Sequence, residues 1–255
     1  MNEPTAQTPF GPIETWLRFG LGFAVIALTS AVYFLICVLL IPFRATRVRV
    51  GNVASWIMGR GSVRAVGTRL RIVHGERFDR HRPAIYVGNH TSSLDTFISI
   101  GVAPLGTAGI VKAEVVRVPV FGQAYWLSGH LRIQRADRAG SIEAMAELAD
   151  FVRRKGLGIW MMPEGTRSKD GRLAPFKKGL VHLAIATRLP VVPVLLHGVQ
   201  RRWPNKSLTL TPGEVIVEVA EPIPTDDWSL DRIDEHVAQV RQVFLDGLPL
   251  EQLPL

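Results

Sequence analysis

Cysteine is nearly absent from this sequence, since Cys37 is the only one among 255 residues. A single cysteine excludes an internal disulfide, and it excludes cysteine-rich zinc sites as well. Cys37 lies within an apolar run, which indicates an inert packing residue rather than a reactive thiol. The seven histidines also lack the His-Glu-x-x-His spacing of zinc hydrolases. The sequence therefore predicts no metal site.

Several common catalytic motifs are missing too. The chain has no Gly-x-Ser-x-Gly nucleophile elbow, which argues against a serine hydrolase. It has neither a Gly-x-x-x-x-Gly-Lys phosphate loop nor a dinucleotide fingerprint after a predicted strand. It also contains no internal repeat and no low-complexity segment. The chemistry of this chain must therefore come from other residue patterns.

Apolar and positively charged residues, by contrast, are abundant. Hydrophobic residues make up 47% of the chain, and the formal net charge is +8. This charge favours anionic partners: nucleic acid, an anionic lipid surface or a phosphorylated substrate. The basic segment 200–206 could contact nucleic acid, but no nucleic-acid-binding module is recognisable. A lipid surface or an acidic carrier protein is the better partner because the chain also has an apolar anchor.

This anchor is the run 19–43, which contains no charged residue. About 20 apolar residues suffice to cross the hydrocarbon core of a bilayer. A cleaved signal peptide is less favoured, because its apolar core is usually only about 7–15 residues long. Three arginines follow the run closely, and the positive-inside bias places the side that follows it in the cytosol. We expect attachment to the cell membrane with the main domain on the cytoplasmic side, by a helix that crosses the bilayer or enters one leaflet.

The expected domain organisation has three parts. Residues 1–15 are polar, contain three prolines and are expected to be flexible. Residues 16–66 form the membrane-anchoring region, in which the apolar helix 19–43 is followed by the segment 50–66. That segment contains Trp56 between arginines and glycines, so it fits either an interfacial helix on anionic lipid or a linker. The globular domain is expected over residues 67–250.

Within the globular domain, short apolar runs alternate with amphipathic segments. Strands are predicted at 70–73, 84–87, 107–112, 131–134, 158–162, 191–196, 207–210 and 215–219. Helices are predicted at 94–100, 141–154, 178–187 and 231–245. This alternation is typical of a layered α/β domain.

A polar segment, Asn89-His90-Thr91-Ser92-Ser93-Leu94-Asp95, lies between a predicted strand and a predicted helix. A carboxylate such as Asp95 can hold one nitrogen of the His90 imidazole and leave the other free to act as a base. The same residues also fit a helix capping box, in which Asp95 only accepts backbone N–H groups. On this segment alone, the capping interpretation is favoured and the catalytic one stays open.

A second polar segment, Pro163-Glu164-Gly165-Thr166-Arg167-Ser168, directly follows the strand predicted at 158–162. Gly165 lets the backbone approach a ligand, and Arg167 can bind a phosphate through two parallel hydrogen bonds. An ordinary turn with a surface ion pair explains six isolated residues equally well. Two more cations, Lys177 and Lys178, precede the next predicted helix.

Considered together, these segments resemble the glycerolipid acyltransferase family. Four family blocks occur in order between residues 85 and 194. They are Asn-His-x4-Asp at 89–95, then Lys112, Gly122 and Arg135 at the family spacing, then Pro-Glu-Gly-Thr-Arg-Ser at 163–168, and finally the apolar stretch 191–194 with its proline. Two positions depart from the pattern: Val115 replaces the usual leucine, and Gln134 replaces the aspartate common before the arginine.

The resemblance implies an α/β domain with a mixed sheet flanked by helices. It implies transfer of a fatty acyl group from a coenzyme A or acyl carrier protein thioester to a lysolipid hydroxyl. The acceptor it favours is 1-acyl-sn-glycerol-3-phosphate, which gives phosphatidic acid for phospholipid biosynthesis, with no cofactor beyond the donor. Other acceptors also fit: a lyso-ornithine lipid, a lysophospholipid or glycerol-3-phosphate. A catalytically silent lipid-binding protein is a further alternative, against which the intact His90 and Asp95 pair argues.

The resemblance also implies residue roles. His90 takes the proton of the acceptor hydroxyl, and Asp95 orients the imidazole and stabilises its charged form. The hydroxyl attacks the thioester directly, because no activated serine or cysteine is evident. Backbone donors after His90 or near Gly165 stabilise the oxyanion. The substrate-binding residues are Lys112, Arg135, Glu164, Gly165, Thr166 and Arg167, with the cations on phosphates and Glu164 ordering Arg167 or contacting the acceptor.

Overall fold

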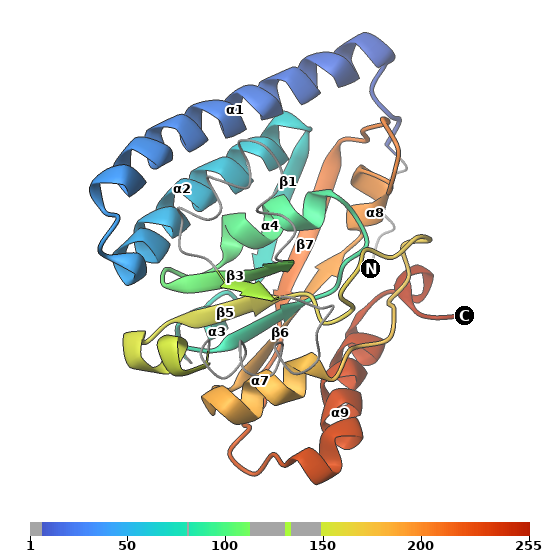
Figure 1. The fold of residues 1–255 in the computed structure, drawn as a ribbon. Helices are drawn as coiled ribbons and strands as arrows, with labels where there is room; N and C mark the ends of the chain where they lie inside the picture. The colour runs from blue at the N-terminus through green and yellow to red at the C-terminus, as the bar shows by residue number, and fades with distance from the viewer. Residues whose placement is uncertain (1–6, 81, 113–130, 134–148) are drawn as a thin grey trace.

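A single curved sheet with helices on both faces forms the globular part of the chain (Figure 1). The computed structural model describes residues 7–80, 82–112, 131–133 and 149–255, with the backbone alone at 110–112 and 131–133. The strands are β1 Thr68–Val73, β2 Ile85–Gly88, β3 Thr107–Lys112, β4 Leu131–Ile133, β5 Gly158–Met161, β6 Val191–His197 and β7 Gly213–Val219. Their order in the sheet is β1-β7-β6-β2-β5-β3-β4, with β6 and β7 antiparallel and the other pairs parallel. The predicted mixed sheet is therefore confirmed.

Helices cover this sheet on two sides. They are α1 Pro12–Leu39, α2 Arg44–Ala65, α3 Arg77–Arg80, α4 Leu94–Val102, α7 Gly179–Thr187, α8 Val199–Arg202 and α9 Ile233–Gly247. Short 3-10 turns lie at Leu230–Arg232 and Leu250–Gln252. In Figure 1, α1, α2 and α4 lie on one side of the sheet, whereas α7 and α9 lie on the other. The helix predicted at 141–154 is seen from residue 149, and its earlier part lies outside the described residues.

Neighbouring residues of a strand pack into different layers. On β2, Ile85 and Val87 join the hydrophobic cluster that includes α7 and α9, whereas Tyr86 joins the cluster that includes α4. All four residues of this strand are buried. Burial on both faces explains why the strand is an uninterrupted apolar run, as is usual for parallel strands covered by helices.

The long apolar helix α1 is fixed to the rest of the chain at both ends. Just before its start, the Phe10 N–H donates to the Leu210 oxygen at 2.9 Å. Just after its end, the Arg44 guanidinium lies 4.2 Å over the Phe151 ring. Helix α1 is the only described helix that is long and apolar enough to cross a membrane, and most of its large apolar side chains are exposed. It begins at Pro12 and ends before Pro42, so it is shifted towards the N-terminus relative to the predicted helix 19–43.

Helix α2 packs between α1 and α4. The prediction that residues 50–66 are helical is confirmed, and the linker interpretation is wrong because α2 is packed into the domain. The crossing with α4 requires glycine, since a Cβ atom at Gly59 would lie 2.5 Å from the Gly101 nitrogen. Asn52 adds a buried hydrogen bond from Nδ2 to the Thr107 oxygen at 2.8 Å. Helix α2 is therefore part of the globular unit as well as the partner of α1.

The strand predicted at 207–210 is wrong. The Ser207 oxygen accepts a hydrogen bond from Trp203 Nε1 at 2.9 Å, and Ser207 Oγ accepts one from the Thr209 N–H at 2.9 Å. The Leu210 oxygen pairs with the N-terminal segment before α1. These contacts occupy backbone groups that a strand would need for its ladder.

Candidate active site

The segment after β2 is held against β6 by the side chain of Asn89. Asn89 Nδ2 donates to the Leu196 oxygen at 3.1 Å, and the Leu196 N–H donates to Asn89 Oδ1 at 2.8 Å. The amide thus continues the pairing of β2 with β6 past the end of β2. Gln252, near the C-terminus, donates to the same Leu196 oxygen at 3.1 Å. The residue that follows Asn89 is therefore presented from a firmly bonded position.

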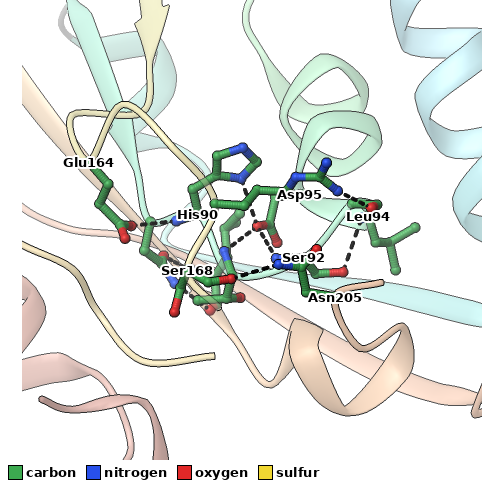
Figure 2. A network of polar contacts seen from close by, with 12 residues as sticks. His90, Ser92, Leu94, Asp95, Glu164, Ser168 and Asn205 are labelled. Carbon is green, nitrogen blue, oxygen red and sulfur yellow. Dashed lines mark hydrogen bonds and ion pairs between the residues drawn. The ribbon is translucent and has the colours of Figure 1, made fainter. Parts of the chain in front are cut away.

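His90 and Asp95 contact each other at the start of α4 (Figure 2). His90 Nδ1 lies 3.1 Å from Asp95 Oδ2, and the same oxygen accepts the N–H groups of Thr91 at 2.5 Å and Ser92 at 2.6 Å. The Leu94 N–H, the first of α4, donates to Ser92 Oγ at 3.1 Å. The geometry therefore fits both the capping and the histidine-orienting interpretation of Asp95, and one oxygen makes the contacts of both.

The tautomer of His90 follows from this arrangement. Asp95 is completely buried, and burial raises the pKa of its carboxyl group, while the hydrogen bonds from His90, Ser92 and Thr91 oppose this rise. The Asp95 oxygen is an acceptor, so the nitrogen of His90 that faces it must carry a hydrogen. His90 is therefore in the tautomer protonated at Nδ1. The His90 side chain is 18% exposed, and its Nε2 is left as the acceptor.

Glu164 and Ser168 hold the backbone of His90 from the other side. Glu164 Oε1 accepts the His90 N–H at 2.6 Å, and Oε2 accepts the Ala174 N–H at 3.0 Å. The Ser168 N–H donates to the His90 oxygen at 2.8 Å. Figure 2 shows Glu164 and Ser168 bonded to the segment that carries His90. Burial raises the pKa of Glu164 to about 7, while both backbone donors lower it. The bonds of Glu164 thus go to backbone groups rather than to the expected Arg167.

Arg167 reaches the start of α4 instead. Its Nη1 donates to Ser93 Oγ, and the arginine remains exposed. Thr166 is exposed beside it. Gly165 has a φ of +72°, and a Cβ atom there would lie 3.1 Å from the Lys177 side chain. This left-handed turn explains the requirement for glycine, and it brings Arg167 close to the segment of His90.

The other predicted binding residues are less completely described. Lys112 is the last residue of β3, and its side chain lies outside the described part. Gly122 and Arg135 also lie outside the described residues. Lys178 forms an ion pair with Asp234 at 2.7 Å, so it is directed to α9. The structure thus brings together the segments 89–95 and 163–168.

Residues of the segment 200–206 support the site, and the sequence did not indicate this. Asn205 Nδ2 donates to the Ser168 oxygen at 2.9 Å, and Ser92 Oγ donates to the Trp203 oxygen at 2.6 Å. No local sequence pattern predicts either contact, because each joins residues far apart in the chain. Among the described residues, no group of three or more histidine, cysteine or acidic side chains could hold a metal ion.

Comparisons with known proteins agree with this geometry. The family model described as Acyltransferase matches residues 70–197. The 1-acyl-sn-glycerol-3-phosphate acyltransferase of Limnanthes douglasii is 40% identical over 233 residues, covering 91% of this chain and 82% of the relative. The enzyme of the same name from Cocos nucifera is 39% identical over 239 residues, covering 94% and 77%.

A solved structure has the same fold. It is the 1-acyl-sn-glycerophosphate (LPA) acyltransferase PlsC from Thermotoga maritima, with a TM-score of 0.68 and 23% identity. The similarity covers 92% of this chain and 96% of that one. The family model and the plant relatives place this chain in the glycerolipid acyltransferase family, as an O-acyltransferase of the 1-acylglycerol-3-phosphate acyltransferase type.

Proposed function

We propose that this chain transfers a fatty acyl group from a coenzyme A or acyl carrier protein thioester to the free hydroxyl of 1-acyl-sn-glycerol-3-phosphate, giving phosphatidic acid. The observation that carries this proposal is the contact of His90 Nδ1 with the buried Asp95 carboxylate, which leaves Nε2 available as a base. The names of the plant relatives support the choice of acceptor. The cationic Arg167, bonded to Ser93 beside this pair, suits a phosphorylated substrate.

These positions predict a reaction in two steps: the acceptor hydroxyl adds to the thioester, and the tetrahedral intermediate then breaks down. His90 Nε2 takes the proton of the acceptor hydroxyl as its oxygen attacks the thioester carbon. Asp95 stabilises the imidazolium that forms. The tetrahedral intermediate then expels the thiolate, the carbon–sulfur bond breaks, and His90 returns the proton to the sulfur. The products are the acylated acceptor and the free thiol, so no residue of the chain becomes acylated.

Of the two places expected to stabilise the oxyanion, the turn near Gly165 is the one that we propose. The N–H groups of Thr91 and Ser92 donate to Asp95, and that of Leu94 donates to Ser92 Oγ. The Gly165 N–H donates to the Met162 oxygen at 3.1 Å. These groups are already used within the chain. We therefore assign the developing negative charge to the exposed backbone at Thr166, next to Gly165, and keep Arg167 for the phosphate.

The test of the acceptor is a panel of lysolipids. The purified full chain is incubated with an acyl-coenzyme A, and release of free thiol is measured with each acceptor in turn. We expect the highest kcat/KM with 1-acyl-sn-glycerol-3-phosphate, and less with glycerol-3-phosphate, a lysophospholipid or lyso-ornithine lipid. Faster turnover with an acceptor that lacks phosphate would overturn the choice of acceptor. A complete lack of turnover with the panel, repeated with acyl carrier protein as donor, would favour a silent lipid-binding protein.

Arg167→Ala is expected to raise KM for a phosphate-bearing substrate by about 10–100-fold, because a hydrogen bond to a charged group contributes about 1.5–3 kcal/mol. Arg167→Lys keeps the charge but not the two-pronged geometry, so its KM should lie between those of the wild type and the alanine variant. Arg188→Ala is the matched control, since Arg188 is an exposed arginine at the end of α7. Equal and negligible effects at both arginines would remove the role of Arg167.

We further propose that α1 lies along one leaflet of the membrane, with the remainder of the chain on the cytoplasmic side. A crossing helix would place its two ends on opposite sides of the bilayer. Both ends of α1 are instead fixed to the same globular unit, through Phe10 and Leu210 at one end and Arg44 and Phe151 at the other. The exposed apolar side chains along the helix then enter the lipid.

The double variant Phe23→Glu with Leu35→Glu is expected to reduce binding to lipid vesicles by more than tenfold in a sedimentation assay. Each change places a charge on an exposed apolar position of α1, where lipid contact would otherwise remove the side chain from water. The control is Ala238→Glu with Gln239→Glu, which adds the same charge to exposed positions of α9. Equal retention of both variants on vesicles would show that α1 is not the attachment surface.

A further inference from the structure

A cavity of about 260 Å³ lies between α2, α3 and the end of α4, away from the proposed active site. Its lining includes Asn52, Trp56 and Arg60 of α2, Asp79 and Arg82 near α3, and Leu105 after α4. Asp95 lies in the first turn of α4 and His90 just before this helix, whereas the cavity adjoins its last residue, Val102. The axial rise from Asp95 to Val102 is roughly 10 Å. The cavity is therefore a separate place in the fold.

The lining of this cavity includes an arginine whose guanidinium group is held in place, Arg60. Arg60 Nε donates to the Gly101 oxygen at 2.9 Å, and Arg60 Cζ lies 4.6 Å from the centre of the Trp56 ring. Partial burial lowers the pKa of Arg60, which reflects the loss of water around its charge. Among the described residues, its two Nη groups have no hydrogen-bond or ion-pair partner. These donors are oriented but available.

The described lining of the cavity carries a net positive charge, because only one of its two arginines is paired with an acidic residue. Arg82 pairs with Asp79 and donates from Nε to the Phe78 oxygen at 3.3 Å. That ion pair is neutral in sum, so Arg60 supplies one uncompensated positive charge among the described lining residues. A group with negative charge and several acceptor oxygens, such as a phosphate, matches this lining.

The rim of the cavity is apolar and exposed. Trp56 is 45% exposed and Leu105 is 60% exposed, and Val53 and Ile57 next to Trp56 are exposed as well. Helix α2 runs directly against α1 (Figure 1), so Trp56 lies on the helix next to the one that we assign to the lipid. Tryptophan beside a cation is typical of residues at the boundary between headgroups and acyl chains. A free phosphate ion would use the cation but would gain nothing from this rim.

We propose that this cavity binds the phosphate-bearing headgroup of an anionic phospholipid, with Arg60 on the phosphate and Trp56 and Leu105 against the acyl chains. The proposal rests on the membrane attachment of α1 given above. The bound lipid would contact the end of α4, whose first turn holds Asp95. The lipid is thereby placed as a structural ligand of the α2–α4 crossing and not as a substrate.

The test compares binding of the full chain to phosphatidylcholine vesicles with and without phosphatidylglycerol. Arg60→Gln is expected to reduce the preference for phosphatidylglycerol by about tenfold or more, because a hydrogen-bonded charge pair is lost. The matched control is Arg64→Gln, an exposed arginine of the same helix outside the cavity lining, for which the loss should stay within a few-fold. Equal losses for both variants would show a general effect of surface charge and would overturn the proposal.

A second variant and a second ligand keep this test decisive. Because Arg60 also donates a hydrogen bond to Gly101, the folding of the Arg60→Gln variant is checked by thermal unfolding. The double variant Arg82→Gln with Leu105→Gln changes the cavity lining and leaves that hydrogen bond in place. Inorganic phosphate added to the vesicles should not remove the preference, and full competition by equal concentrations of phosphate would show a free-anion site instead. Vesicle binding is measured without turnover, so a negative result would contradict the lipid site and not the proposed reaction. Loss of binding to all vesicles by the wild type would contradict the membrane attachment instead.

Discussion

His90→Ala is expected to reduce kcat for acyl transfer by about 10²–10⁴-fold, the usual contribution of a general base. Without the imidazole, the acceptor hydroxyl must lose its proton to water during the attack on the thioester. The affinity for the acyl donor should change little, because His90 Nε2 accepts a proton and does not bind the phosphates of the donor or the acceptor. The measurement is release of free thiol from an acyl-coenzyme A in the presence of 1-acyl-sn-glycerol-3-phosphate.

The control for this variant is His182→Ala. His182 is exposed on α7, so its loss removes an imidazole without touching the start of α4. Both variants should sediment with vesicles as the wild type does and should unfold at a similar temperature. The backbone bonds of His90 to Glu164 and Ser168 do not depend on its side chain, so the loop should keep its position. If His90→Ala turns over at the rate of His182→Ala, His90 is not the base.

Much of the site was predictable because the information is local. The run at β2 is apolar at each position, which indicates a strand buried on both faces. The cap at Ser92 and Asp95 needs residues only three apart, and the helix that follows has its own apolar periodicity. Sequence alone could therefore place His90 at a strand-to-helix junction and give it Asp95 as a partner.

The role of Glu164 shows where local reasoning stops. Its contact with the His90 N–H joins residues 74 positions apart. That contact depends on β5 lying next to β2 in the sheet, which brings the segments after the two strands together. The strand order is not the chain order, and the sequence alone offered no pattern for it. The sequence therefore suggested that Glu164 orders Arg167 or contacts the acceptor, whereas both of its oxygens bond backbone groups.

The strand wrongly predicted at 207–210 has the same origin. Its composition suits a strand, but Trp203 and the segment before α1 use its backbone acceptors. The support given by Asn205 and Gln252 likewise comes from contacts that only the folded chain creates. Contacts between distant parts of the chain, and not local propensity, determine the conformation of these residues.

Asp95→Asn is expected to reduce kcat by about 10²–10⁴-fold while the protein still folds. The asparagine oxygen can still accept the N–H groups of Thr91 and Ser92, so the start of α4 keeps its cap. The neutral amide oxygen still faces His90 Nδ1, but it cannot stabilise the imidazolium of His90 as the carboxylate does. The substitution therefore separates the two functions of one carboxylate oxygen.

The stability of this variant should fall modestly. Asp95 Oδ1 is buried and has no hydrogen-bond partner within the described part of the chain. An amide NH2 group at that place would be an unsatisfied donor, which costs about 1–3 kcal/mol. Asp95→Ala is the comparison, because it removes the cap as well as the charge and should lower the unfolding temperature further. Full activity of Asp95→Asn with an unchanged pH profile would mean that Asp95 only caps the helix, and that His90 is oriented by its backbone bonds to Glu164 and Ser168 instead.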